Sequence, residues 1–318
     1  MIITLDHTTT GEVARRLVRT REEGGAPGLA HVLTLIVSLP SRVDEDIVDT
    51  ANVVSYEHPM RVIVVVTDPD GDARLDAEIR VGGDAGASEV VILRAYGDAT
   101  ENEISLVTGL LLPDAPVVTW WPHDAPSAPA QAPLGRIAQR RITHSLTSAP
   151  IERYAYTPGD TDLAWARLTR WRDQLAAILD QRPGHAVTAV EVTGDPEGSS
   201  SNLLTAWLGA ALAAPAHLVE HDAQHERIDD DGVHSVRLRH ADGDIVLART
   251  SDRFADLSWP GRRTQRLLLP SASLRDKLSE ELRQLDPDDV FGSALGAFQA
   301  ARPGAAVSLP TPPEDDDV

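Results

Sequence analysis

Two nearly continuous apolar runs, residues 31–39 and 60–66, limit what the N-terminal part of this chain can fold into. A run without polar alternation is typical of a β-strand that is covered on both faces, as in a parallel sheet. Between the runs, Val43, Ile47 and Ala51 have the spacing of one helix face. The pattern therefore predicts a strand–helix–strand unit in a sheet with helices on its faces.

The remaining pattern predicts two mixed-sheet α/β domains with flanking helices. A chain of 318 residues is long enough for two domains. In the second half, residues 233–240 and 244–250 flank Ala-Asp-Gly, which predicts a hairpin and an antiparallel strand region. We therefore assign an N-terminal α/β domain (1–125), a Pro-rich connection with a linking strand (126–158), a C-terminal α/β domain (159–301) and a disordered acidic tail (302–318).

Charge and composition exclude several classes of function. The formal charge of −20 disfavours binding to nucleic acids and to anionic membranes. The absence of cysteine excludes thiol catalysis and disulfides. The N-terminus lacks a basic stretch followed by an apolar one, so we expect a cytoplasmic protein. The 28 arginines against a single lysine, Lys277, fit a GC-rich genome.

A pair of tryptophans closes the stretch at residues 110–123, LLLPDAPVVTWWPH. Consecutive strand residues point to opposite faces, so Trp120 and Trp121 cannot enter the same core layer. Either both are core residues on different faces, or one is exposed and forms part of an interface. We therefore retain both tryptophans as candidates for partner binding.

The search for catalytic chemistry favours a protein that is not an enzyme. No strand is followed by Gly-x-Gly-x-x-Gly, so the sequence provides no support for a dinucleotide-binding fold. The residues that could form a metal site, His217, His221 and His225, lie where the pattern predicts a strand, which would scatter their rings. With no nucleophile–base pair either, we predict no metal, no cofactor and a non-catalytic partner-binding role.

Arginines concentrate in the predicted antiparallel region, where they leave two interpretations open. A solvated sheet face would explain them, and so would a surface that binds an acidic partner or a sugar phosphate, because guanidinium groups pair with carboxylates and phosphates. An arginine-rich pocket would make the protein a sugar-phosphate enzyme or a metabolite sensor. The anion-binding candidates are Arg262, Arg263 and Arg266.

Two other segments carry aromatic and basic residues together. His58 and Arg61 stand just before a buried strand, and the predicted helix 161–179 carries Trp165 with three arginines. A core face with a basic outer face explains such a helix, but tryptophan and arginine are also the residues that dominate interfaces. The candidates for partner binding are therefore Trp120, Trp121, Arg61, His58, Trp165, Arg167, Arg170 and Arg172.

Several phrases of the sequence resemble one family, the glucose-6-phosphate dehydrogenase assembly proteins known as OpcA. They are EHPMRVIVV (57–65), LLLPDAPVVTWWP (110–122), RRITHS (140–145), DLAWARLTRWR (162–172) and ELRQLDPD (281–288). The resemblance spans nearly the whole chain and suggests an actinobacterial source. It implies a two-domain α/β protein whose partner is glucose-6-phosphate dehydrogenase, and whose binding promotes assembly or activation of that enzyme in the oxidative pentose phosphate pathway.

Overall fold

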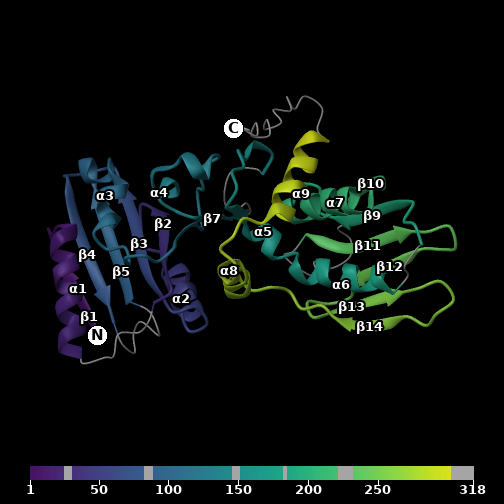
Figure 1. The fold of residues 1–318 in the computed structure, drawn as a ribbon, viewed down its shortest axis with the longest axis horizontal. Coiled ribbons are helices and arrows are strands. Elements are labelled where there is room, and N and C mark those ends of the chain that lie inside the picture. Colours follow the sequence, from purple (N-terminus) through teal and green to yellow (C-terminus); the bar gives the residue numbers. More distant parts are fainter. Residues whose placement is uncertain (25–30, 82–88, 145–150, 182–184, 221–231, 302–318) are drawn as a thin grey trace, which may run out of the picture.

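The computed structural model describes residues 1–24, 31–81, 89–144, 151–181, 185–220 and 232–301, which form two β-sheets with helices on their faces (Figure 1). Both sheets are mixed and the second is largely antiparallel, as predicted. The predicted acidic tail (302–318) lies outside the described residues. Among the described helices, none combines the length and apolar character that a membrane crossing requires.

The first sheet has eight strands in the described part of the chain. Their spatial order is β1 (Ile2–Leu5), β4 (Arg74–Arg80), β5 (Glu89–Tyr96), β3 (Met60–Asp68), β2 (Leu33–Pro40), β6 (Val117–Trp121), β7 (Arg140–Thr143) and β8 (Asp160–Asp162). The six strands from β5 to β8 are parallel, while β1 and β4 form an antiparallel extension. The sheet thus continues through residues that we assigned to the connection and to the start of the second domain.

The order of the parallel strands corrects one expectation from the sequence. Counted along the chain from β2, the order is 3-2-1-4-5-6, which is that of a doubly wound dinucleotide-binding sheet. The missing glycine motif had left this topology without support. Buried apolar strands and right-handed crossovers are enough to build it, whereas the glycines shape the first turn, admit the pyrophosphate and allow close packing of the first helix.

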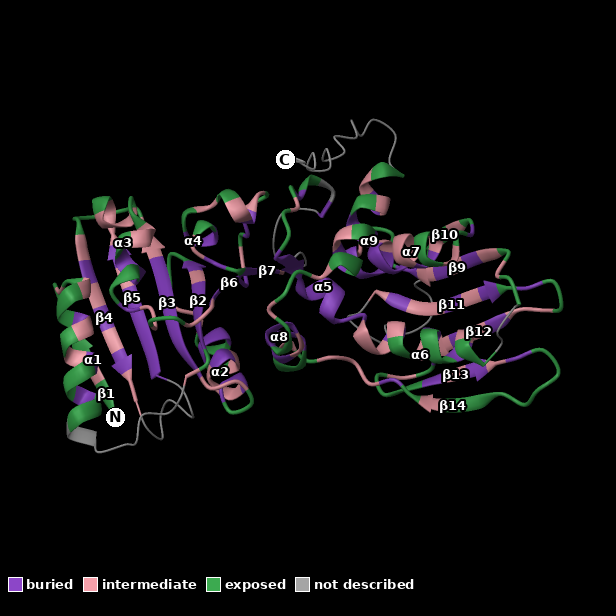
Figure 2. Ribbon diagram, viewed as in Figure 1, coloured by how far each residue is buried: buried purple, intermediate pink, exposed green. Residues whose placement is uncertain are grey.

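Helices cover both faces of the first sheet. One face packs against α2 (Glu45–Val54) and α8 (Leu274–Arg283), and the other packs against α1 (Thr10–Gly24), α3 (Glu103–Thr108) and α4 (Pro133–Arg136). Figure 2 shows the central strands as almost wholly buried. This burial on both faces explains why β2 and β3 are continuous apolar runs. Short 3-10 turns at Gly97–Thr100 and Pro129–Gln131 complete this part, whereas a third, Ile151–Arg153, contributes Ile151 to the core of the second sheet.

The second sheet has a core on one face. Its six described strands lie in the order β10 (Ala216–Glu220), β9 (Ala189–Gly194), β11 (Val233–Arg239), β12 (Ile245–Arg249), β13 (Phe254–Ser258) and β14 (Gln265–Leu268). The helices α5 (Leu163–Ala166), α6 (Thr169–Asp180), α7 (Ser199–Leu212) and α9 (Asp289–Ala300) all contribute to the apolar cluster on this one face. The predicted hairpin is confirmed: β11 and β12 pair across a turn in which Gly243 has a φ of 122°.

Helix α8 joins the two parts of the chain. It follows the second sheet in sequence, yet its Leu278 and Leu282 belong to the core of the first sheet and it packs beside α2 (Figure 1). At the junction, the guanidinium of Arg140 on β7 donates to the Glu281 carboxylate of α8 at 2.6 Å, and both side chains are about 95% buried. Because this contact is buried and charged, it fixes how the two sheets sit against each other.

The region at 160–179 differs from the single helix that we expected. Residues Asp160–Asp162 form the edge strand β8, and two helices, α5 and α6, follow it. The helical spacing of Leu168, Trp171 and Leu175 is confirmed. The spacing could not reveal that the Asp162 side chain accepts a hydrogen bond from the Ala164 N–H and so caps α5. The chain therefore pairs with β7 first and becomes helical only after this cap.

We predict that both tryptophans of β6 are needed for stability. Trp120 is fully buried on the α2–α8 face, and Trp121 is 6% exposed on the other. Replacing either by alanine should lower the free energy of unfolding by about 3–5 kcal/mol, because it leaves a large cavity. Urea unfolding would measure this. Tyr56, which is 65% exposed, is the matched control, and its alanine variant should change stability by less than about 0.5 kcal/mol.

We also predict that Arg140 and Glu281 depend on each other. Arg140→Met or Glu281→Met should each destabilise the protein by about 3–5 kcal/mol, because each leaves the other charge buried without compensation. The double variant Arg140→Met with Glu281→Met should be clearly more stable than the sum of the single effects implies. A double-mutant cycle in urea would test this, and additive effects would show that the pair is not coupled.

Candidate functional site

The residues of the 57–61 motif hold the two parts of the chain together. The ring of His58 lies 3.1 Å from the Ser279 carbonyl and 3.2 Å from its hydroxyl, on α8. Glu57 accepts from the same hydroxyl at 2.6 Å and pairs with Arg275 at 2.7 Å. This motif therefore fixes α8 on the first sheet.

Arg61 belongs to the interior of the first sheet. It is 5% exposed, donates to Glu89 at 3.0 Å and to the Leu110 carbonyl, and Glu89 is also bound by Arg21. The buried guanidinium thus ties β3 to β5 and to the segment after α3. A cation in this position stabilises the fold and has no surface to offer a partner.

The motif at 162–172 forms the other side of the junction. Trp165 is fully buried, its indole N–H donates to Asp288 at 2.7 Å, and Arg172 stacks over its ring at 3.9 Å. Asp288 is also the N-cap of α9, so the indole positions that helix. Arg170 donates to the Pro270 carbonyl at 2.9 Å and holds the segment that leads to α8.

These positions correct our expectation for most of the partner-binding candidates. Five of them are buried: Trp120, Trp121, Arg61, Trp165 and Arg167. A side chain with no accessible surface cannot contact a second protein, so we no longer propose these five as contact residues. The other three, His58, Arg170 and Arg172, are half-buried and bind neighbouring segments of the same chain.

The anion-binding candidates do not form the pocket that we considered. Arg266 pairs with Asp256 at 2.9 Å, so its charge is already compensated. Arg262 lies over the ring of Trp259 at 5.0 Å, in the turn between β13 and β14, and Arg263 is exposed in the same turn. Within the described residues, no group of three or more metal-ligating side chains is gathered either, and His221 and His225 lie outside those residues.

The position where a doubly wound sheet binds pyrophosphate is the turn from β2 into α2. Here it has the sequence PSRVDED (40–46) and contains no glycine. The Asp44 carboxylate accepts from the backbone N–H groups of Asp46 and Ile47 and pairs with His123 at 3.0 Å. These are the donors that would otherwise face a phosphate. Glu45, also in the first turn, pairs with Arg80 at 2.8 Å, so it is Asp44 that occupies the backbone donors of this corner.

The structure exposes a different feature, the uncovered side of the second sheet. Among the described residues no helix packs on it, and the strand registers define its members. We call it the open face; it consists of Ala189, Glu191, Thr193, His217, Val219, Ser235, Arg237, Arg239, Val246, Ala248, Phe254, Asp256, Ser258, Arg266 and Leu268. The alternation of apolar and polar residues in β9 (190–193) and β11 (235–238) is the sequence signal that could have indicated it.

The open face combines apolar side chains with paired charges. Phe254 and Leu268 are cross-strand neighbours, 39% and 58% exposed, at the β13–β14 edge. Arg237 lies between Glu191 at 3.5 Å and Asp244 at 3.2 Å. The charges on this face therefore nearly cancel, although the chain as a whole carries −20.

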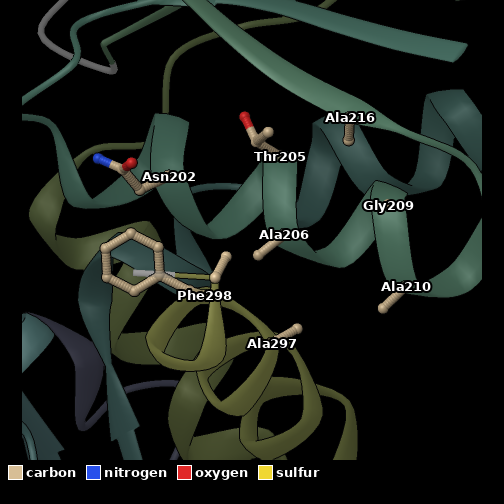
Figure 3. Close-up of a pocket in the computed structure, with 9 residues that line it drawn as sticks. Asn202, Thr205, Ala206, Gly209, Ala210, Ala216, Ala297 and Phe298 are labelled. Carbon is tan, nitrogen blue, oxygen red and sulfur yellow. The ribbon is translucent and has the colours of Figure 1, made fainter. Parts of the chain in front are cut away.

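A second accessible feature is a groove between α7 and α9. It has a volume of about 400 Å³ and is lined mostly by small side chains, with Phe298 at one side (Figure 3). Figure 3 shows Ala206 of α7 directed toward α9, where Ala297 lies. Because these residues are small, the two helices approach closely and leave a shallow surface. The groove lies on the helical side of the second sheet, opposite the open face.

Comparison with known proteins gives the family. Two family models, described as the N-terminal and the C-terminal domain of a glucose-6-phosphate dehydrogenase subunit, match residues 51–156 and 158–295 respectively. No curated protein sequence matches the chain.

Solved structures give distant likenesses. A 3-ketoreductase from Actinomadura kijaniata, crystallised in an open conformation with TDP-benzene and NADP, is 10% identical with a TM-score of 0.48, covering 84% of this chain and 94% of its own. Glucose-6-phosphate 1-dehydrogenase from Mycobacterium avium is 11% identical with a TM-score of 0.38, covering 83% and 90%. The two matched domains, by contrast, span most of the sequence. The chain belongs to the OpcA family of glucose-6-phosphate dehydrogenase assembly proteins.

Proposed function

We propose that this protein is a non-catalytic subunit that binds glucose-6-phosphate dehydrogenase and promotes its assembly or raises its activity. Membership of a family described as subunits of that enzyme supports the choice of partner. The observation that supports a non-catalytic role is the position of Asp44. It occupies, with its own hydrogen bonds, the corner where a sheet of this strand order would bind a dinucleotide.

We propose the open face as the docking surface. The predicted aromatic and arginine anchors are engaged inside the junction, whereas the open face presents apolar edges and charges that nearly cancel. A locally neutral surface lets an acidic protein approach a partner without the repulsion that its remaining surface would cause. An interface of standard size, about 1,600 Å² in total, can form on a flat sheet of this kind.

Activation then follows from differential binding. A subunit that prefers one conformation or oligomer of the dehydrogenase shifts the population toward it by the difference in affinity. A coupling free energy of about 1–3 kcal/mol is enough to change the activity several-fold or more. The paired strands of the open face support this role, since a surface that is already ordered loses little entropy when it binds.

We expect the purified chain to co-elute with its host's dehydrogenase in size-exclusion chromatography and to change that enzyme's oligomeric state or initial velocity. The same fractions would be assayed with and without added chain. A dehydrogenase whose elution volume and velocity both stay unchanged would contradict the proposed function.

Paired surface variants locate the contact. Leu268→Asp and Phe254→Asp should weaken the complex by about tenfold or more, because each places a carboxylate in a desolvated contact. Ala210→Glu, in the α7–α9 groove, is the matched control and should bind as the wild type does. Isothermal titration calorimetry would measure this. If only Ala210→Glu weakened the complex, the docking surface would lie at α7 and α9, and the proposed function would still hold.

We further expect the chain not to bind NADP⁺ or NADPH. Each would be titrated at up to about millimolar concentration, with tryptophan fluorescence and thermal stability as readouts and the dehydrogenase as positive control. The carboxylates at the start of α2 should repel the phosphates. Saturable stabilisation by either nucleotide would contradict our interpretation of the Asp44 corner.

A further inference from the structure

One edge of the second sheet is accessible along its backbone. In the described part of the chain, β14 is the last strand on this side of the sheet and pairs only with β13 (Figure 1). Three of its four residues, Gln265, Arg266 and Leu268, are exposed. An edge strand presents backbone N–H and C=O groups that can pair with a strand of another chain.

The register shows which backbone groups of β14 face outward. The Leu269 N–H donates to the Arg253 carbonyl at 2.8 Å, so these two opposite residues are in hydrogen-bonded positions. Bonded and non-bonded positions alternate along an antiparallel ladder, which makes Arg266 and Leu268 non-bonded. Their N–H and C=O groups therefore point away from β13, and they bond to no other backbone group within the described residues.

The outward-facing stretch is short. Pro270 follows two residues after Leu268, has no N–H, and its carbonyl already accepts from Arg170 at 2.9 Å. Proline close to a strand end is one of the features that keep sheet edges from aggregating. The edge therefore offers the backbone groups of Arg266 and Leu268 to a strand that fits them, and little beyond these two residues.

The hairpin of β13 and β14 is basic, although the chain is acidic. Residues 252–269 contain four arginines and two aspartates, a net charge of +2, whereas the whole chain carries −20. Arg253, Arg262 and Arg263 are exposed and form no ion pair within the described residues. Arg253 lies opposite Leu269 at one end of β14, and the other two lie in the turn at its other end. Cations without a paired carboxylate thus flank the edge on both sides.

Apolar side chains lie beside the same edge. Leu268 is 58% exposed and its cross-strand neighbour Phe254 is 39% exposed, both on the open face. Alternate side chains of a strand added to β14 would lie on this face, next to Leu268. The edge therefore suits a strand that carries an apolar residue on this face and carboxylates toward its ends.

We propose that the dehydrogenase partner adds an extended, acidic segment to β14 as a further strand of the second sheet. This inference rests on the proposed function and specifies how the partner engages the margin of the open face. The backbone groups of Arg266 and Leu268 bond to the added strand, and the flanking arginines select its carboxylates. A second copy of this chain is a poorer occupant, because two hairpins of charge +2 would face each other.

A proline at an outward-facing position tests the backbone contact. Arg266→Pro removes an N–H that does not bond to β13, so the ladder within the chain is retained. Arg266→Ala removes the same side chain but keeps the N–H, and it is the matched control. In isothermal titration calorimetry with the host's dehydrogenase, Arg266→Pro should bind about tenfold more weakly than Arg266→Ala, because a partner carbonyl loses its donor. Equal affinities would overturn strand addition.

Amide hydrogen exchange on the wild-type protein keeps the test decisive if Arg266→Pro fails to fold. The amides of Arg266 and Leu268 should exchange rapidly in the free chain and at least about tenfold more slowly in the complex. Unchanged exchange in the complex would contradict the inference. Protection already present in the free chain would also overturn it, since a second copy or another segment of this chain would then occupy the edge.

Charge reversal tests the acidic character of the added segment. Arg262→Glu combined with Arg263→Glu should weaken the complex by about tenfold and reduce the dependence of its affinity on salt. Arg15→Glu combined with Arg19→Glu, at two exposed positions of α1, changes the net charge equally and should bind as the wild type does. Equal weakening by both pairs would show that overall charge governs binding, and the choice of an acidic segment would be wrong.

The wild-type titration separates this inference from the proposed function. If the wild-type chain binds the dehydrogenase while Arg266→Pro and Arg266→Ala bind alike, strand addition is wrong and the proposed function still holds. If the wild-type chain does not bind the dehydrogenase, the proposed function is wrong and the inference fails with it.

Discussion

The buried ion pair between Arg140 and Glu281 is the constraint on which the arrangement of the molecule depends. It links the fifth parallel strand of the first sheet to a helix that arrives from the second sheet, and burial raises the pKa of Glu281 while Arg140 opposes that effect. A pair of this kind need not add much stability over an apolar contact, but it tolerates only one geometry. The same helix contributes Leu278 and Leu282 to the first core, so the two parts share interior residues.

The strands and most helices could be predicted because their causes are local. Continuous apolar runs gave β2 and β3, and Gly243 marked the hairpin of β11 and β12. The sharing of interior residues between the two parts could not be predicted. Helix α8 has the same pattern whether it covers the second sheet or the first, and only contacts with residues more than a hundred positions away decide between them.

Most of the candidate contact residues lie inside the chain for a related physical reason. Tryptophan and arginine dominate interfaces between proteins, and they also dominate a crowded junction inside one protein, where each large side chain needs a hydrogen-bond partner. Trp165 with Asp288 and His58 with Ser279 resemble interface contacts, except that both sides belong to one chain. Residue type therefore indicated an interface. Only the burial of these residues shows that this interface lies within one chain.

The first sheet has the strand order of a dinucleotide-binding sheet without the glycine motif that usually accompanies it. The strand order depends on apolar pairing and on the handedness of crossovers, and neither requires a ligand. The turn after β2 is free to change, because its role in the fold is only to start α2. In this chain Asp44 performs that role with its own carboxylate, as capping residues do elsewhere. The change that closes the corner to a dinucleotide therefore costs the fold nothing. It leaves an ordered framework whose remaining accessible surfaces, the open face above all, are available for contact with another protein.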